Sequence, residues 1–268
     1  MNKYKMICLD IDGTLLNSNH QISEETNRTI REVYEKYNIP VVLISARMPK
    51  GIVYLAEELG LKSPVVAYSG GLITEEGKIL LNHTFPVSYA EDVYTHASNM
   101  GIHVSVYINN EWYVEKFDKE SELESRITGI IPKTENFKNI FSDEKKAPNK
   151  ILCISTPEKI KELTDKLNKI YNGKINIYAS KDTYLEIMPE NITKVTAIDF
   201  LCKKYNITKE EVIAMGDNFN DTAMISYCGM GIAMGNAPEG VKEKADFVTL
   251  TNDEHGVAYA VKKFCFEK

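Results

Sequence analysis

Two pairs of aspartates each follow a short apolar run, and their spacing points to a shared chemical role. Asp10 and Asp12 stand two positions apart after the first run, so both side chains leave the same face of an extended chain. Asp217 and Asp221 follow another apolar run late in the sequence. Ionised carboxylates near a core are costly unless a cation compensates them. Carboxylate oxygens without His or Cys are the ligands that Mg²⁺ prefers, so the pairs predict a magnesium site if both runs belong to one sheet.

Each aspartate pair also has an ordinary structural interpretation. Asp12–Gly13 is a common hairpin turn, although residues 14–19 do not alternate as a returning strand would. Asp217 suits a turn, and Asp221 suits a helix N-cap. Taken singly, these positions favour the structural interpretation. Two such pairs at the ends of apolar runs favour a metal site.

The hydroxyl of Ser45 and the ammonium group of Lys194 could supply the anion donor and the cation that the four aspartates lack. Ser45 follows an apolar run and precedes a helical pattern, where free backbone N–H groups suit a phosphate, although a simple helix cap explains Ser45 equally well. Lys194 opens a helical pattern, where a cation is unfavourable. Lys194 is therefore either an ordinary surface lysine or a residue that faces an anion.

The elements that must position these side chains form a parallel sheet. The first part of the chain alternates apolar runs with amphipathic helical patterns, which is typical of a doubly wound, mostly parallel (Rossmann-like) α/β core. The apolar runs are residues 5–9, 41–44 and 64–68. Ligands bind at the carboxyl ends of such strands, which is where Asp10, Ser45 and Ser69 fall.

Residues 82–188 show a different sequence pattern, in which helical segments are mixed with segments that alternate as strands do. That mixture is typical of an α+β module, in which we expect residues 135–149 to be loop-rich because they are polar. After Met188 the chain again alternates apolar runs with helical patterns. We therefore predict a core domain of residues 1–81 plus 189–268 and an inserted α+β domain of residues 82–188.

Composition argues against several classes of function. The chain has 268 residues, of which 43% are hydrophobic, and a net charge of −6 without a basic run, so nucleic-acid binding is not indicated. No apolar stretch approaches membrane-spanning length, and the first residues run into a strand without room for a signal peptide. The five cysteines are scattered without CxxC spacing, which is typical of a reducing compartment. We expect a cytoplasmic protein.

The ordered set of motifs resembles that of the haloacid-dehalogenase-like (HAD) phosphohydrolases. The motifs are DIDGT at residues 10–14, Ser45, Lys194 and GDNFND at residues 216–221. The inserted domain resembles the cap of the Cof-type (class IIB) members, and the Gly-Asn-Ala-Pro loop at residues 235–238 fits as well. The resemblance thus spans the whole chain.

Some positions depart from the family pattern. The family usually has Gly at the position of Ala46 and Asn at the position of Ser69, and it commonly has Gly where this chain has Asn191 and Val195. None of these changes removes an acid, the hydroxyl or the cation. They bear on the geometry of the phosphate loops and on substrate choice.

The resemblance implies a role for each acid. Asp10 would be the nucleophile that forms an aspartyl-phosphate, and Asp12 would protonate the leaving group and then activate water. Mg²⁺ would be bound by the Asp10 carboxylate, the Asp12 backbone carbonyl and Asp217, with Asp221 supporting this set from behind.

The resemblance also implies the phosphate ligands and the substrate class. Ser45, Lys194 and Asn220 would bind the phosphate oxygens. Substrates would be small phosphorylated metabolites, with sugar phosphates first and pyridoxal phosphate or a flavin precursor next, and no obligate protein partner is implied. The tip of the hairpin at residues 178–184 is a candidate for contact with the leaving group.

Three other functions compete with the phosphatase. A phosphomutase would use the same two acids but return the phosphoryl group to a sugar. A response-regulator-like phosphoryl acceptor needs only about half of this length. A non-catalytic sensor of phosphorylated metabolites would not need the complete set of acids, hydroxyl and cation.

Overall fold

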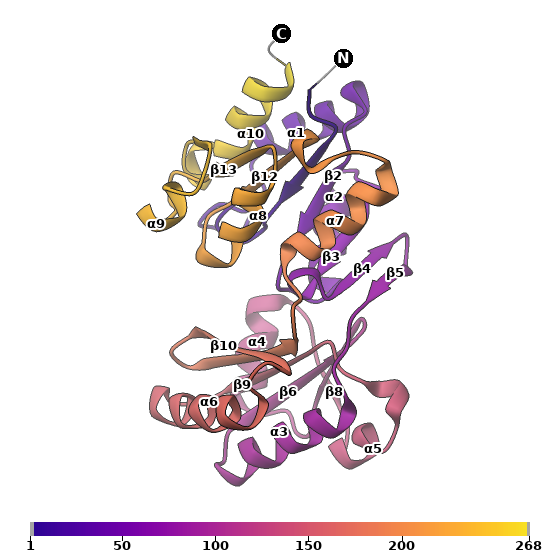
Figure 1. The fold of residues 1–268 in the computed structure, drawn as a ribbon, viewed down its shortest axis with the longest axis vertical. Helices are drawn as coiled ribbons and strands as arrows, with labels where there is room; N and C mark the ends of the chain where they lie inside the picture. The colour runs from indigo at the N-terminus through magenta and orange to yellow at the C-terminus, as the bar shows by residue number, and fades with distance from the viewer. Residues whose placement is uncertain (1–2, 267–268) are drawn as a thin grey trace. The chain divides into compact units, whose positions relative to one another are not determined.

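The computed structural model describes residues 3–266, which form two compact units (Figure 1). The first unit comprises residues 3–46, 52–79 and 193–266, and the second comprises Arg47–Gly51 and Leu80–Ile192. The domain limits expected from the sequence lie close to these boundaries, except for Arg47–Gly51, whose grouping was not predicted. Residues 1–2 and 267–268 of the predicted core domain lie outside the described residues.

The first unit is built on an eight-stranded sheet with the order β14-β13-β12-β1-β2-β3-β4-β5. The strands are β1 (Met6–Leu9), β2 (Val41–Ile44), β3 (Val65–Ala67), β4 (Leu72–Glu75), β5 (Lys78–Asn82), β12 (Val212–Gly216), β13 (Met230–Ala233) and β14 (Phe247–Val248). Strand β1 is central and pairs in parallel with β12 and β2, whereas β4 is antiparallel to β3. All residues of β1, β2 and β12 are buried, because parallel strands are covered on both faces.

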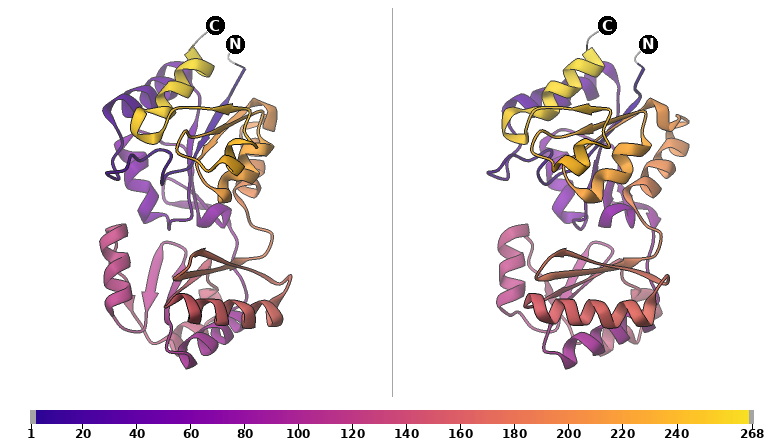
Figure 2. Two further views of the ribbon diagram at one scale, coloured as in Figure 1. Left: turned by 90° about the vertical axis from the view of Figure 1, so that its left-hand side faces the viewer. Right: turned by 60° about the vertical axis from the view of Figure 1, so that its left-hand side comes forward.

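Helices cover both faces of this sheet, with α1 and α10 on one face and α7 and α8 on the other (Figures 1 and 2). The helices are α1 (Glu24–Tyr37), α2 (Lys50–Glu58), α7 (Lys194–Tyr205), α8 (Thr222–Tyr227), α9 (Glu239–Lys242) and α10 (Gly256–Val261). Short 3₁₀ helices are η1 (Tyr68–Gly70), η3 (Lys209–Glu211), η4 (Phe219–Asp221) and η5 (Asn252–Glu254), and η6 (Lys262–Phe266) is a π-helix that follows α10. This arrangement confirms the predicted α/β class with a mostly parallel core sheet. Within residues 3–266, no helix combines the length and apolar character needed to span a membrane.

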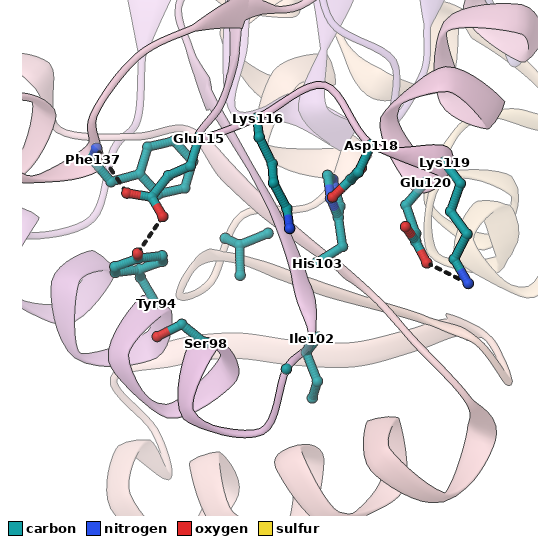
Figure 3. Close-up of a pocket in the computed structure, with 12 residues that line it drawn as sticks. Tyr94, Ser98, Ile102, His103, Glu115, Lys116, Asp118, Lys119, Glu120 and Phe137 are labelled. Atoms are coloured by element: carbon teal, nitrogen blue, oxygen red, sulfur yellow. Dashed lines mark hydrogen bonds and ion pairs between the residues drawn. The ribbon is translucent and has the colours of Figure 1, made fainter.

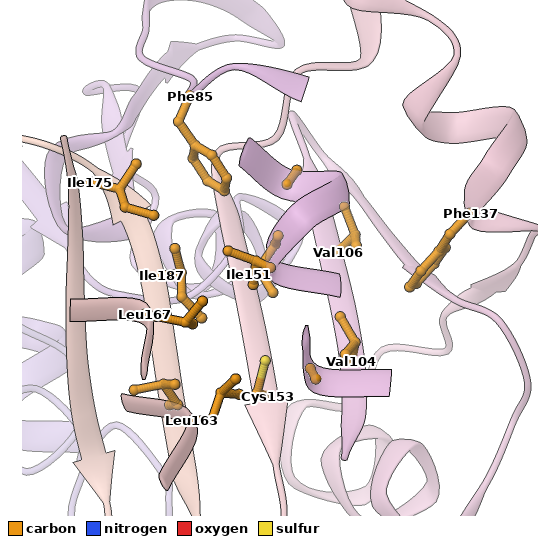
Figure 4. Packing of buried hydrophobic residues seen from close by; sticks show 14 of the residues in the cluster. Phe85, Val104, Val106, Phe137, Ile151, Cys153, Leu163, Leu167, Ile175 and Ile187 are labelled. Atoms are coloured by element: carbon orange, nitrogen blue, oxygen red, sulfur yellow. The ribbon is translucent and has the colours of Figure 1, made fainter. Parts of the chain in front are cut away.

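The second unit has a six-stranded sheet with the order β10-β11-β9-β6-β7-β8. Its strands are β6 (His103–Ile108), β7 (Glu111–Val114), β8 (Lys133–Thr134), β9 (Lys150–Ile154), β10 (Ile175–Lys181) and β11 (Tyr184–Pro189). Its helices are α3 (Val87–Asn99), α4 (Lys119–Thr128), α5 (Phe137–Phe141) and α6 (Pro157–Tyr171), with a short 3₁₀ helix η2 (Glu144–Lys146). Side chains from α3, α5 and α6 pack on one face of this sheet and form the core in Figure 4.

The segment expected to be loop-rich contains a short helix. Helix α5 begins after Asn136, whose side chain accepts a hydrogen bond from the Lys138 backbone N–H. Phe137, Ile140 and Phe141 are buried in the core of the second unit. Three apolar side chains at helical spacing therefore stabilise a helix that the polar composition of the segment concealed.

The other face of the second sheet carries a buried ion pair. Lys150 Nζ lies 2.7 Å from Glu186 Oε2, and each side chain is only 10% exposed. Tyr178 donates a hydrogen bond to the same carboxylate at 3.1 Å. Burial raises the pKa of Glu186, but the Lys150 ammonium, together with hydrogen bonds from Ser180 and Tyr178, holds that pKa below its ordinary value. Glu186 therefore carries its charge in the folded protein at neutral pH.

Candidate active site

Three carboxylates meet at the carboxyl end of the central strands of the first unit. Asp10 follows β1 and its backbone N–H donates to the Met215 carbonyl of β12 at 3.0 Å. One carboxylate oxygen from each of Asp10, Asp217 and Asp221 lies within 4.8 Å of the others. The parallel pairing of β1 with β12 thus brings together acids that are distant in the sequence.

Lys194 lies in contact with two of these acids. Its Nζ is 2.5 Å from Asp10 Oδ1 and 2.5 Å from Asp221 Oδ1, and it also donates to the Ile44 carbonyl at 3.4 Å. The residue is only 2% exposed, which excludes an ordinary surface lysine. Burial opposes the charge on Lys194, but the two carboxylates outweigh burial and raise its pKa. The ammonium form is therefore the one present at neutral pH.

Both carboxylate oxygens of Asp221 accept hydrogen bonds that support the loop carrying Asp217. Its Oδ2 accepts hydrogen bonds from the backbone N–H groups of Asp217 and Asn218, both at 3.1 Å, while Oδ1 accepts from Lys194. A side chain at Gly216 would collide with Asp221, so a glycine is needed at the end of β12. These bonds hold the loop that carries Asp217.

The loop after Asp10 packs closely against Asp217. Thr14 Oγ1 donates to Asp217 Oδ1 at 3.0 Å, and Thr14 is buried. Gly13 has a φ of +80°, and a side chain there would collide with the Asp217 carboxylate. Asn236 Nδ2 donates to the Gly13 carbonyl at 2.9 Å and so holds this loop from the other side.

The cluster has more negative than positive groups. Burial raises the pKa of Asp10, and Lys194 only partly offsets this effect. Burial also raises the pKa of Asp217 to about 6, against the hydrogen bond from Thr14. Asp10 therefore needs a further cation to remain ionised at neutral pH, and the all-oxygen donor set of Asp10 and Asp217 fits a hard divalent metal such as Mg²⁺.

The other predicted site residues are placed differently. Asp12 is exposed, because β1 ends at Leu9 and the strand alternation assumed for the pair does not extend to Asp12. Ser45 is 3% exposed at the end of β2, directly after the Ile44 carbonyl that Lys194 contacts. Asn220 is exposed in η4, beside Asp221. Thus the structure gathers Asp10, Lys194, Asp217 and Asp221, with Ser45 adjacent, and leaves Asp12 and Asn220 on the surface.

Sequence reasoning gave no role to several residues that hold the site. Thr14 appears in the first motif and Asn236 in the Gly-Asn-Ala-Pro loop, so their motifs were the available signal. Asn252 lies in no recognised motif, so no sequence signal pointed to it. Its Nδ2 donates to the Leu16 carbonyl at 2.9 Å, and its backbone N–H donates to Asn236 Oδ1 at 3.0 Å.

A pocket of about 520 Å³ lies within the second unit (Figure 3). His103, Asp118 and Glu120 in this pocket offer ligand atoms within 4.8 Å of one another. However, His103 Nδ1 lies 2.9 Å from Asp118 and Nε2 lies 2.9 Å from Ser105 Oγ. Asp118 also caps α4 by accepting from the Ser121 N–H at 3.0 Å. These contacts give His103 and Asp118 a structural role, and we assign no ligand to this pocket.

Known proteins share this architecture along the whole chain. Residues 7–261 match the family model of the haloacid dehalogenase-like hydrolases. A Bacillus subtilis protein named 5-amino-6-(5-phospho-D-ribitylamino)uracil phosphatase YcsE is 32% identical over 264 residues, covering 96% of this chain and 94% of that protein.

Solved structures agree with this match. A haloacid dehalogenase-like hydrolase from Bacteroides thetaiotaomicron is 34% identical, with a TM-score of 0.90 over 97% of this chain and 99% of that one. The HAD subclass IIB sugar phosphatase BT4131 is 22% identical and shares the fold, with a TM-score of 0.80 over 97% of this chain and 98% of that one. The match to the family model confirms the resemblance found in the sequence: the chain belongs to the haloacid dehalogenase-like hydrolases and is an enzyme of the phosphatase type.

Proposed function

We propose that this protein is a Mg²⁺-dependent phosphatase that hydrolyses small phosphorylated metabolites, with sugar phosphates as the first candidates. The observation that carries the proposal is the buried Asp10 carboxylate, which contacts the Lys194 ammonium and lies within 4.8 Å of two further acids at the strand ends. A carboxylate held beside a cation is suited to attack an anionic phosphate, because the cation reduces the repulsion between them.

The reaction has two balanced steps. An Asp10 oxygen attacks phosphorus, the bond from phosphorus to the leaving oxygen breaks, and Asp12 donates a proton to that oxygen. Water then attacks the aspartyl-phosphate, Asp12 takes its proton, and the bond between phosphorus and Asp10 breaks. The exposed position of Asp12 supports this role, because the acid must meet both the leaving group and water.

The phosphate oxygens would be bound by Lys194, Ser45 and Asn220. Lys194 supports this assignment because its Nζ contacts the nucleophile itself. Ser45 lies at the end of the neighbouring strand β2, directly after Ile44, whose carbonyl also contacts Lys194. Charge spread over the phosphate oxygens in the transition state would be stabilised by these donors.

Asp10, Asp217 and the backbone carbonyl of Asp12 would hold Mg²⁺, which when bound would neutralise charge on the phosphate. Asp221 fits the role of support and not of ligand, because both of its oxygens already accept hydrogen bonds from Lys194 and from the Asp217 loop. Thr14 orients Asp217 through its hydrogen bond to Oδ1.

We assign the second unit the role of a cap that selects the leaving group. A flavin-precursor phosphate is the second candidate substrate, because a relative 32% identical to this chain is named for that activity. The buried state of all five free cysteines supports a cytoplasmic, reducing location.

Turnover of a generic aryl phosphate with Mg²⁺, followed by a panel of phosphorylated metabolites, tests the proposal. Asp10→Asn should abolish phosphate release while leaving the circular dichroism spectrum unchanged. Asp165→Asn, at an exposed position of α6, is the matched control and should keep full activity. Near-wild-type turnover by Asp10→Asn would exclude Asp10 as the nucleophile. Steady phosphate release without a bisphosphate activator separates a phosphatase from a phosphomutase.

A further inference from the structure

The turn that follows β3 has an unusual backbone. Tyr68, Ser69 and Gly70 have φ angles of 50°, 52° and 112°, so three consecutive residues are left-handed. Non-glycine residues rarely adopt this conformation, and a positive φ is an outlier for a bulky residue such as tyrosine. Tyr68 and Ser69 are nevertheless buried, at 1% and 8% exposure. Such strain persists only where the surrounding structure enforces it, and it is concentrated at functional sites.

One side of this turn is bonded to Ser45. The Ser69 N–H donates to the Ser45 carbonyl at 2.9 Å, and the Ser45 N–H donates to the Val66 carbonyl of β3 at 2.9 Å. The backbone of Ser45 is thus held on both sides by residues 66–69. Any shift of the turn therefore moves the end of β2.

The other side of the turn packs against the start of α7. A side chain at Gly70 would collide with the Thr193 carbonyl and would lie only 3.0 Å from its carbon atom. Thr193 is the N-cap of α7 and directly precedes Lys194. The absence of a side chain at residue 70 lets the helix start approach the turn this closely. Lys194 Nζ in turn lies 2.5 Å from Asp10, where a small displacement would break the contact.

We propose that the left-handed turn Tyr68–Gly70 sets the spacing between Ser45 and Lys194, with Gly70 as a positioning residue. The inference rests on the proposed function, in which Ser45 and Lys194 bind the same phosphate. A simpler interpretation is that the turn only reverses the chain between β3 and β4, which pair antiparallel. The two interpretations differ in one respect: only the positioning role links the turn to phosphate affinity.

Gly70→Ala tests the proposal, with Gly77→Ala as its control. Gly77 also has a positive φ of 78°, but a side chain there would meet no atom within 4 Å. Both variants should lower the melting temperature through backbone strain. Only Gly70→Ala should weaken competitive inhibition by inorganic phosphate, by at least about tenfold, because it displaces Lys194 from its position. A folded Gly70→Ala protein with an inhibition constant within about twofold of wild type would overturn the proposal.

A pair of substitutions at Ser69 decides the question even if Gly70→Ala does not fold. Thr and Asn are of similar size and both are polar, but a β-branched residue disfavours the left-handed conformation that Asn tolerates. Phosphate should therefore inhibit Ser69→Thr at least about fivefold more weakly than Ser69→Asn. Equal inhibition of the two variants would overturn the proposal. A wild-type protein that neither hydrolyses aryl phosphates nor binds phosphate would instead overturn the proposed function.

Discussion

Replacing Lys194 by methionine removes the cation that contacts the buried acids Asp10 and Asp221, while keeping most of the side-chain volume. Lys194 Nζ lies 2.5 Å from both Asp10 and Asp221, and all three residues are at most 6% exposed. Without the ammonium group, two carboxylates would remain buried without their partner. The variant should therefore destabilise the first unit.

The expected size of this effect follows from the burial of the pair. Removing one member of a buried ion pair costs about 3–5 kcal/mol, because it leaves an uncompensated charge. With a denaturant slope of about 2 kcal/mol per molar urea, a loss of about 4 kcal/mol lowers the unfolding midpoint by about 2 M. Lys204→Met is the matched control on the same helix. Lys204 lies 2.9 Å from Glu75, but the side chains are 31% and 28% exposed, so its loss should cost about 0–1 kcal/mol.

The assay is urea unfolding in EDTA, monitored by two signals. Trp112 is the only tryptophan and lies in the second unit, so its fluorescence reports on that unit alone. Circular dichroism reports on both units. Lys194→Met should shift the circular dichroism transition of the first unit and leave the fluorescence midpoint unchanged. Equal circular dichroism midpoints for Lys194→Met and Lys204→Met would refute the argument that Lys194 compensates buried charge.

Three further predictions concern catalysis, the metal and pH. Asp12→Asn should lower kcat by about 10²–10⁴-fold with little change in KM, because Asp12 transfers a proton and does not bind the phosphate; an unchanged kcat for aryl phosphate would exclude this role. Dialysis against EDTA should abolish hydrolysis and Mg²⁺ should restore it, whereas full activity after chelation would argue against a metal in the Asp10–Asp217 cluster. Burial raises the pKa of Glu186, but Lys150 and the hydrogen bonds from Ser180 and Tyr178 together bring the folded pKa below the ordinary value of 4.5. The stability that the ion pair adds is therefore present above pH 4.5 and is lost as the pH falls through the folded pKa. The difference in Trp112 unfolding midpoint between wild type and Glu186→Gln should therefore narrow from about pH 7 to about pH 3.5, and a constant difference would contradict the assignment.

Apolar runs were sufficient to predict the core strands. Strands such as β1 and β2 are buried on both faces, so their sequences are continuously apolar and easily recognised. The order of strands and helices then placed Asp10 and Asp217 at the same edge of one sheet. The alternation of apolar runs with helical patterns was enough to predict the α/β class.

Other features depend on contacts that a sequence pattern does not encode. The burial of Lys194 depends on two acids from distant segments, so an isolated lysine at a helix start gives no sign of it. The different exposure of Asp10 and Asp12 depends on where β1 ends, and strand ends are the least certain part of any pattern. Helix α5 is only five residues long, too short to show a full helical period. In each case a tertiary contact decides what the local sequence leaves open.

The pairing of β1 with β12 has a consequence for synthesis of the chain on the ribosome. Strand β1 emerges well before its partner β12, which begins at Val212, after the second unit. Residues 80–192 of the second unit are contiguous and carry their own core, so they can fold while one edge of β1 still lacks its neighbour. The nascent chain must therefore keep an apolar strand edge from pairing with other chains until β12 is made. Asp10, Lys194 and Asp217 meet only after that point, so the proposed catalytic cluster is completed only once β12 has been made.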